Sequence, residues 1–214
     1  MTRFDLRAQL LASGLSALAG FVDALGFIAL GGFFVSFMSG NSTRLAVGIA
    51  QGSANGAIAA GLIAAFILGV IVGSIAGRLA GPWRRAAVIG LVALILAAAA
   101  LLHAFGHREF ALALMPIAMG AENAVFEQGG DVKIGLTYMT GALVKMGQAM
   151  AGAVFGGDRF AWTPYLLLWS GLLVGAILGA TTYRAIGLSG LWIAAGVAGG
   201  LALVASASPD RSHA

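Results

Sequence analysis

Six long apolar runs restrict the fold of this sequence more than any other feature. They cover about residues 8–30, 56–77, 86–104, 110–128, 163–183 and 187–205. About 20 helical residues cross the hydrocarbon core of a bilayer, where the backbone must satisfy its own hydrogen bonds. The runs therefore predict an all-α integral membrane protein with six transmembrane helices. We expect a single membrane domain over residues 1–214 that ends in a polar C-terminal tail at 206–214.

The few charges fit a membrane protein better than a nucleic-acid-binding one. Charged residues make up 9% of the chain, and the 12 lysines and arginines are scattered around the apolar runs. Basic residues in that arrangement act as topology signals, so no nucleic-acid partner is expected. The chain has no cysteine, which excludes disulfides, thiol nucleophiles and thiolate metal sites.

The second feature is an internal repeat. The motif Phe37-Met38-Ser39-Gly40 returns as Tyr138-Met139-Thr140-Gly141, and Arg44 returns as Lys145, both at an offset of 101. Residues 19–24 match 119–124 at an offset of 100, and two glycine triplets match at 102. Repeat one then covers about residues 8–104 and repeat two about 110–205.

The orientation of the two repeats depends on whether residues 33–51 and 135–152 span the membrane. If they do not, each half has three helices. The basic residues then divide nine to three, with Arg44, Arg108 and Arg184 on the outer side. If both segments span, the basic residues outside them divide evenly. The positive-inside rule favours the first arrangement, which predicts two inverted three-helix repeats, each with a re-entrant, broken-helix segment, and both termini in the cytoplasm.

The re-entrant segments supply the first candidate site residues. We expect Gly40 and Gly141 to break the helix, and Ser39, Asn41, Ser42, Thr43 and Thr140 to cap the helix that follows. Two helix N-termini with Arg44 and Lys145 one turn further on would favour an anion or a polar solute. The alternative is a turn capped by its own side chains, with no ligand.

Asp23 and Glu122 are the two acidic residues most clearly inside predicted spans. Asp23 precedes the first re-entrant segment, and Glu122 with Asn123 precedes the second. We expect the pairs Asp23–Arg44 and Glu122–Lys145, either as structural braces or with one carboxylate coupling proton movement to transport. Glu127 and Asp131 are expected to be solvated loop charges.

No catalytic or metal site is evident in the sequence. His103 and His107 are four residues apart at a helix end, but no third ligand accompanies them, and we expect surface residues. No nucleophile with a nearby base, nucleotide motif or cofactor motif is present, so neither an enzyme nor a cofactor is expected.

Two glycine triplets could bring helices close together. Glycines four residues apart permit tight helix crossing in lipid, either within the chain or in a homo-oligomer. The triplets are Gly69, Gly73, Gly77 and Gly171, Gly175, Gly179.

Several of these motifs resemble the YoaK family of small bacterial inner-membrane proteins, a domain of unknown function. The resemblance rests on residues 20–27, 31–33, 37–42, 119–124 and 137–143. This chain has Ser39 where threonine is common and Glu122 where glutamine is common. The resemblance implies a six-helix protein of the bacterial inner membrane, often supposed to be a permease.

The sequence thus predicts a multi-pass secondary transporter or facilitator for a small polar or anionic solute. The alternatives are a channel and a non-transporting membrane scaffold. The candidate solute-binding residues are Asp23, Ser39, Gly40, Asn41, Arg44, Glu122, Asn123, Thr140, Gly141 and Lys145. The expected partners are the lipid bilayer and an unknown solute.

Overall fold

A helix lies in each of the six predicted spans. The computed structural model describes residues 6–128, 131–132 and 134–207, so residues 208–214 of the predicted tail lie outside the described part. The helices are α1 (Leu6–Ala29), α2 (Met38–Ala50), α3 (Asn55–Ala80), α4 (Arg84–Ala104), α5 (Arg108–Glu122), α6 (Met139–Val154), α7 (Thr163–Ile186) and α8 (Leu191–Ser206). Two short 3₁₀ helices are η1 (Gly81–Trp83) and η2 (Gly187–Gly190), and β1 (Glu127–Gln128) pairs antiparallel with β2 (Asp131–Val132). The fold is therefore helical apart from this small hairpin.

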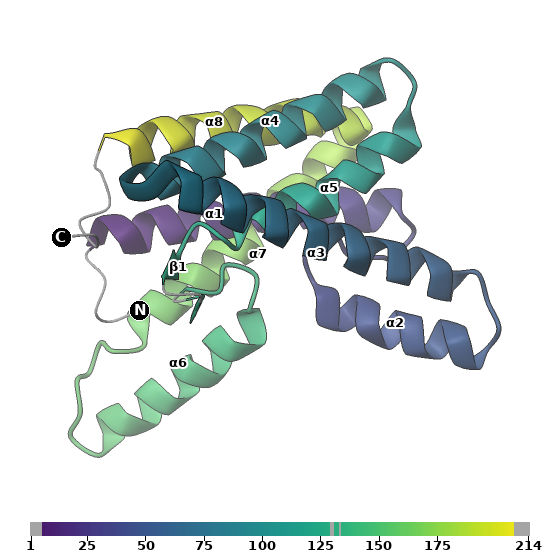
Figure 1. The fold of residues 1–214 in the computed structure, drawn as a ribbon. Coiled ribbons are helices and arrows are strands. Elements are labelled where there is room, and N and C mark those ends of the chain that lie inside the picture. The colour runs from purple at the N-terminus through teal and green to yellow at the C-terminus, as the bar shows by residue number, and fades with distance from the viewer. Residues whose placement is uncertain (1–5, 129–130, 133, 208–214) are drawn as a thin grey trace.

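Three continuous helical stretches are long and apolar enough to cross a membrane. They are Leu6–Ala29, Asn55–Ala104 and Thr163–Ser206. The second stretch contains α3, η1 and α4, and the third contains α7, η2 and α8. Gly81 and Gly187, with φ of 55° and 62°, begin the two 3₁₀ turns in a backbone conformation that favours glycine. The chain reverses direction at each of these turns (Figure 1).

The fourth predicted span is shorter than expected. The apolar run predicted a helix over residues 110–128, but α5 ends at Glu122 and turns and the β1 strand follow. The chain then passes through the β1–β2 hairpin and the second broken segment, residues 134–138, before α6 begins. Pro116 lies inside α5, where its missing N–H removes one helical hydrogen bond.

Connections gather at two ends of the molecule (Figure 1). The 51–54 turn, the 105–107 turn and η2 lie at one end, which we call the His107 end. The start of α1, η1, the 155–162 connection and the end of α8 lie at the opposite end, which we call the Trp83 end. Five helices therefore run from one end of the molecule to the other: α1, α3, α4, α7 and α8.

Glycines bring helices of the two halves into close contact. A Cβ at Gly20 would collide with the backbone of Leu172, and a Cβ at Gly120 with that of Phe66. The reciprocal contacts are from Gly175 to Ala17 in α1 and from Gly69 to Ile117 in α5. In both pairs, α1–α7 and α3–α5, each helix contributes a glycine that lets the backbone of the other helix approach closely.

These contacts correct the predicted register of the glycine triplets. Gly69 and Gly175 meet equivalent residues of the partner helices, as do Gly73 and Gly179. The matching glycines are therefore 106 residues apart, not the 102 of the sequence alignment, a shift of one helical turn. A sequence repeat of four residues cannot reveal such a shift, because every turn of the triplet looks alike.

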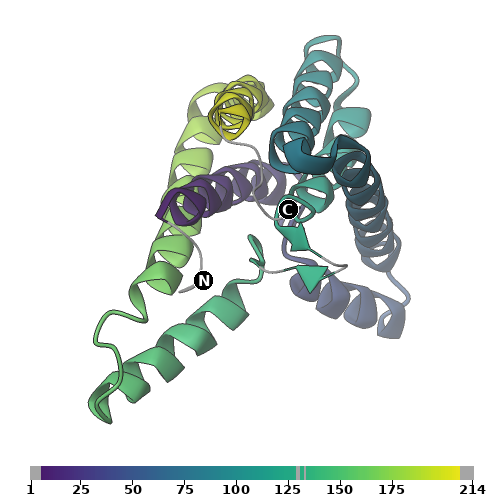
Figure 2. The same ribbon diagram turned by 60° about the vertical axis from the view of Figure 1, so that its left-hand side comes forward.

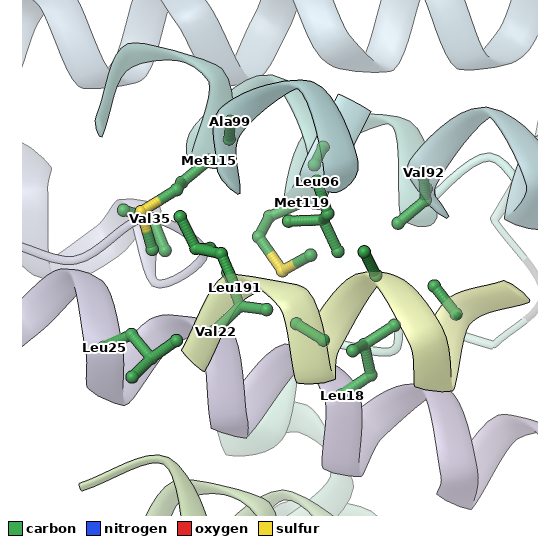
Figure 3. Close-up of a cluster of buried hydrophobic side chains, with 14 of the residues drawn as sticks. Leu18, Val22, Leu25, Val35, Val92, Leu96, Ala99, Met115, Met119 and Leu191 are labelled. Carbon is green, nitrogen blue, oxygen red and sulfur yellow. The ribbon is translucent and has the colours of Figure 1, made fainter. Parts of the chain in front are cut away.

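The core joins both halves of the chain. Leu18, Val22 and Leu25 of α1 lie in one cluster with residues of α4, α5 and α8 (Figure 3). Val35, which follows the first helix break, is fully buried in the same cluster. The broken segment is therefore held in the interior of the bundle.

Candidate functional site

Two short helices, α2 and α6, follow the two broken segments. Both begin near the middle of the molecule and run towards opposite ends, α2 towards the His107 end and α6 towards the Trp83 end (Figures 1 and 2). Of the 16 residues of α6, only Ala142 is buried. The helix N-termini, which carry unsatisfied N–H groups and partial positive charge, therefore lie nearer the centre than the C-termini.

The break in the first half lies earlier than predicted. Gly40 and Gly141 are inside α2 and α6, so the expectation that they break the helix is wrong. The chain leaves α1 at Gly31 and Gly32, whose φ values of 65° and 102° suit glycine. Residues 33–37 then form the irregular segment that leads back to α2.

Asp23 holds this first broken segment. Its Oδ1 accepts hydrogen bonds from the backbone N–H groups of Val35 at 2.7 Å and Ser36 at 2.8 Å. The ion pairs found among the described residues do not include Arg44, so the predicted Asp23–Arg44 pair is wrong. Backbone N–H groups of the broken segment provide closer donors to the carboxylate than the guanidinium does.

Asn123 is the counterpart of Asp23 in the second half. Its Oδ1 accepts a hydrogen bond from Thr137 Oγ1 at 3.2 Å, and its Nδ2 donates to the Met119 carbonyl at 2.9 Å. Asp23 and Asn123 are 100 residues apart, and Ser36 and Thr137 are 101 apart. Each half thus fastens its first helix to its broken segment at the same place.

Asn41 is a structural residue of the first half. Its side-chain amide accepts from the N–H of Phe34 at 3.1 Å and donates to the carbonyl of the same residue at 2.6 Å. The side chain is fully buried. It thereby satisfies both the backbone N–H and the backbone carbonyl of Phe34, polar groups that would be costly to leave unpaired inside the bundle.

The predicted caps do not form. No side-chain hydrogen bond caps the start of α2 or α6. Ser42 and Thr43 instead donate to the carbonyls of Met38 and Ser39 within α2. The helix starts at Met38, so these hydroxyl groups are one turn too late to cap it.

Glu122 differs from Asp23, Asn41 and Asn123 in that its side chain makes no hydrogen bond to the described residues. The side chain is fully buried, and neither carboxyl oxygen has a hydrogen-bond partner among the described residues. Lys145 is exposed on α6 and forms no ion pair with it there, so the predicted Glu122–Lys145 pair is also wrong. The residue at the matching position of the first half is Val22, a core residue.

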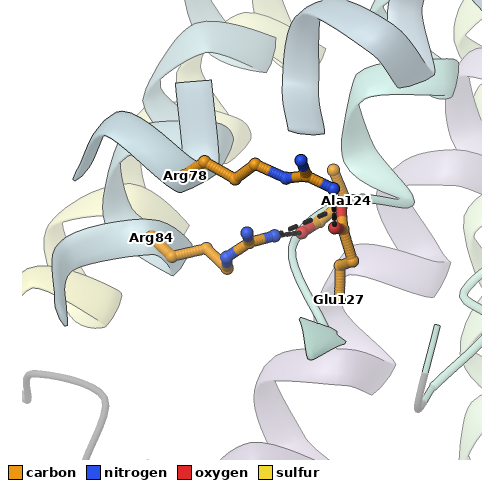
Figure 4. A network of polar contacts seen from close by, with 4 residues as sticks. All are labelled: Arg78, Arg84, Ala124 and Glu127. Atoms are coloured by element: carbon orange, nitrogen blue, oxygen red, sulfur yellow. Dashed lines mark hydrogen bonds and ion pairs between the residues drawn. The ribbon is translucent and has the colours of Figure 1, made fainter. Parts of the chain in front are cut away.

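A polar cluster at the Trp83 end was missed in the sequence (Figure 4). Glu127 is buried and lies 3.3 Å from Arg84 and 3.7 Å from Arg78, so it is not the solvated loop charge we expected. Burial alone would raise the pKa of Glu127, but Ser74, Arg84 and Arg78 outweigh it and hold the pKa below its usual value. Arg84 also donates to the carbonyl of Ala124 at 3.3 Å.

A second missed contact joins the halves directly. The Ser16 hydroxyl of α1 is buried and lies within hydrogen-bond distance of the carbonyls of Leu136 at 3.2 Å and Leu168 at 3.0 Å. A lone serine in an apolar run gives no signal of a partner 120 residues away. The Ser16 hydroxyl thus lies between the second broken segment and α7 and can donate to either of them.

The described residues contain no cluster of three or more side chains that could hold a metal ion. His107 packs edge-on against Phe110 instead.

Comparisons with known proteins extend these observations. The family model described as "Protein of unknown function (DUF1275)" matches residues 11–204. A UPF0700 transmembrane protein of Rhizobium meliloti (strain 1021) is 42% identical over 183 residues, which is 86% of this chain and 79% of that protein. No solved structure matches the chain. The family match confirms the resemblance that the sequence motifs predicted.

Proposed function

Because the chain belongs to the DUF1275 family of membrane proteins, we propose that it is a secondary transporter or facilitator for a small polar or anionic solute. The observation that carries the proposal is the pair of helices α2 and α6, which begin near the middle and run to opposite ends. Non-helical backbone is tolerated at membrane depth only where protein buries it or where it lines a cavity. Interrupted helices in two matching halves are a common construction of secondary transporters.

The proposed topology has six crossings, by α1, α3, α4, α5, α7 and α8, in two inverted halves. The distribution of basic residues between the two ends of the molecule supports this topology. The Trp83 end carries Arg7, Arg78, Arg84, Arg85 and Arg159. The elements at the His107 end carry Arg108 and Arg184, and α2, which runs towards it, carries Arg44. On the positive-inside rule we propose that the Trp83 end and both termini face the cytoplasm of a bacterial cell, with the helices in the inner membrane.

In this proposal the polar residues divide into two groups. Asp23, Asn41 and Asn123 fix the broken segments in place. The backbone N–H groups around Ser39–Gly40 and Thr140–Gly141 are the donors that the solute meets, and Glu122 is the polar group of the interior left for a proton or a solute. Arg44 and Lys145 attract the solute electrostatically. The protein carries out no chemical reaction on it.

A two-stage experiment tests the proposal. The purified full-length protein is first screened against metabolites and anions by thermal shift, because a ligand that binds the folded state raises its apparent stability. Uptake of each binding solute into proteoliposomes is then measured. Saturable uptake supports a carrier, whereas single-channel currents would show a channel instead.

A combined variant of Asp23 and Arg44 tests the alternative that the protein is a membrane scaffold. If wild-type protein moves no solute that it binds, and the combined variant Asp23→Asn, Arg44→Met leaves the cellular phenotype unchanged, the chain is better described as a membrane scaffold.

A further inference from the structure

A recess of about 140 Å³ lies between α2 and α3 near the His107 end. Its walls come from the broken segment, from α2 and from the turn that leads into α3. The lining residues are Phe33, Thr43, Arg44, Val47, Gly48, Gln51, Ser53 and Asn55. Gly48 and Gly56 allow the two helices to approach here, because a Cβ at Gly48 would lie 2.6 Å from the Cα of Gly56.

Arg44 is the only charged residue among those that line the recess. Its guanidinium carbon lies 5.0 Å from the centre of the Phe33 ring. An aromatic face attracts the cation but gives its N–H groups no strong acceptor. The ion pairs among the described residues are formed by Arg78 and Arg84, both with Glu127. Asp23, which the sequence predicted as the partner of Arg44, accepts hydrogen bonds from backbone N–H groups instead. The Arg44 charge is therefore available for a ligand.

The other polar side chains of the recess can each donate a hydrogen bond to an anion. Ser53 Oγ is buried and has no hydrogen-bond partner among the described residues. The amides of Gln51 and Asn55 lie in the same lining, and α3 begins at Asn55 without a side-chain cap. Uncapped N–H groups at a helix start, together with a guanidinium, favour an oxyanion.

The second half of the chain has no such set of residues. At the offset of 101, Thr43, Gln51 and Ser53 correspond to Val144, Gly152 and Val154, and Phe33 corresponds to Ile134. Lys145 replaces Arg44, and it is exposed. The polar recess is therefore not a requirement of the repeated fold, which points to a separate role in the first half.

We propose that this recess binds the carboxylate or phosphate group of a small oxyanion, with Arg44 as its main ligand and Ser53, Gln51 and Asn55 as further donors. The inference deepens the proposed function, on which its consequence for transport rests. It makes the transported solute an oxyanion that is first captured at the His107 end.

Binding is tested on the purified full-length protein in detergent. Its melting temperature is measured with sodium acetate or sodium phosphate against sodium chloride at the same ionic strength. We expect both oxyanions to raise the melting temperature saturably. Arg44→Met should weaken their affinity about tenfold or more, the loss of a charge-assisted contact. Arg44→Lys should retain part of the affinity, and Ser53→Ala should cause a smaller loss.

Arg184→Met is the matched control, since it removes another cation at the His107 end, which is exposed on α7 and does not line the recess. It should bind as the wild type does. The proposal is overturned if Arg44→Met, with wild-type helical circular dichroism, keeps full affinity, or if Arg184→Met loses as much. It is also overturned if neither the free oxyanions nor the anionic lipid of the second arm produces an Arg44-dependent shift.

A second arm separates a free solute from a lipid headgroup. Nanodiscs with and without phosphatidylglycerol are compared in the absence of added anion. A response that needs the anionic lipid, depends on Arg44 and is not displaced by free phosphate supports the site and assigns it to a headgroup phosphate. Arg44-dependent binding without any uptake into proteoliposomes supports the recess and contradicts the transport proposal, whereas uptake that Arg44→Met leaves unchanged contradicts capture at the recess alone.

Discussion

Single polar residues in this protein fix the positions of broken backbone segments. Asp23, Asn41 and Asn123 each bond a segment that has no regular helix of its own. The sequence predicted that these residues matter, because polar groups are rare in apolar runs. It did not predict their roles, because the choice between a side-chain ion pair and a backbone hydrogen bond depends on where the helix ends, and α1 ends at Ala29.

Asn41→Ala tests the backbone role. The substitution leaves the N–H and carbonyl of Phe34 without their buried partner, so we expect a loss of about 1–3 kcal/mol in the free energy of unfolding. Ser42→Ala, which removes an exposed hydroxyl of the same helix, should change stability by less than about 0.5 kcal/mol. Denaturant or thermal unfolding in detergent measures both. Equal effects of the two substitutions would contradict the role given to Asn41.

Glu122→Met tests whether the unpartnered carboxyl is kept for function. Replacing a buried, unpaired polar group with an apolar one of similar size is often neutral or stabilising. We therefore expect an unchanged or higher melting temperature and a loss of solute uptake. Glu109→Met removes an exposed acid of the same helix and should leave uptake intact. A Glu122→Met protein that unfolds at a lower temperature would mean that the carboxyl has a stabilising partner.

Glu127 links stability to pH at the Trp83 end. Since its folded pKa lies below the usual value of 4.5, its ion pairs stabilise the protein fully above that value. The contribution is lost as the pH falls through the lower, folded pKa. Glu127→Gln should cost about 2 kcal/mol at neutral pH, and its difference from the wild type should shrink below pH 4.5. Melting temperatures over a pH series check this, and a difference that grows in acid would contradict it.

At the scale of helices, glycine placement determines which elements pair. At all six glycines of the two triplets, an added Cβ would lie within 3.1 Å of another residue of the same chain. These glycines already face other residues of the same chain, so the predicted homo-oligomer through them would have to displace those contacts. Helix positions were predictable because apolar runs have a spanning length. Helix partners were not, because both triplets present the same small face.

Gly175→Ala tests this packing. The added methyl group would collide with the backbone of Ala17, so we expect destabilisation of about 1–3 kcal/mol or more. Gly61 of α3 has open space where a Cβ would lie, and Gly61→Ala should be neutral or stabilising by up to about 1 kcal/mol. Thermal unfolding of both variants gives the comparison. Similar melting temperatures for the two would show that the α1–α7 contact is looser than described.

For the whole molecule, the two ends predict which residues face each side of the membrane. The chain has no cysteine, so single cysteines report their own position. Asn55→Cys, His107→Cys and Ser189→Cys should react with an impermeant thiol reagent in intact cells. Trp83→Cys and Gly157→Cys should react only after the membrane is opened. Labelling at position 83 from outside would refute the inverted arrangement.

The close packing of α1 against α7 also has a consequence for biogenesis. The ribosome synthesises α1 first, but α7, the helix that covers the glycine and alanine face of α1, is synthesised only after five further helices. Until then this face must be shielded by lipid, by the insertion machinery or by a chaperone. The contact between the first and the seventh helix can therefore form only late in translation.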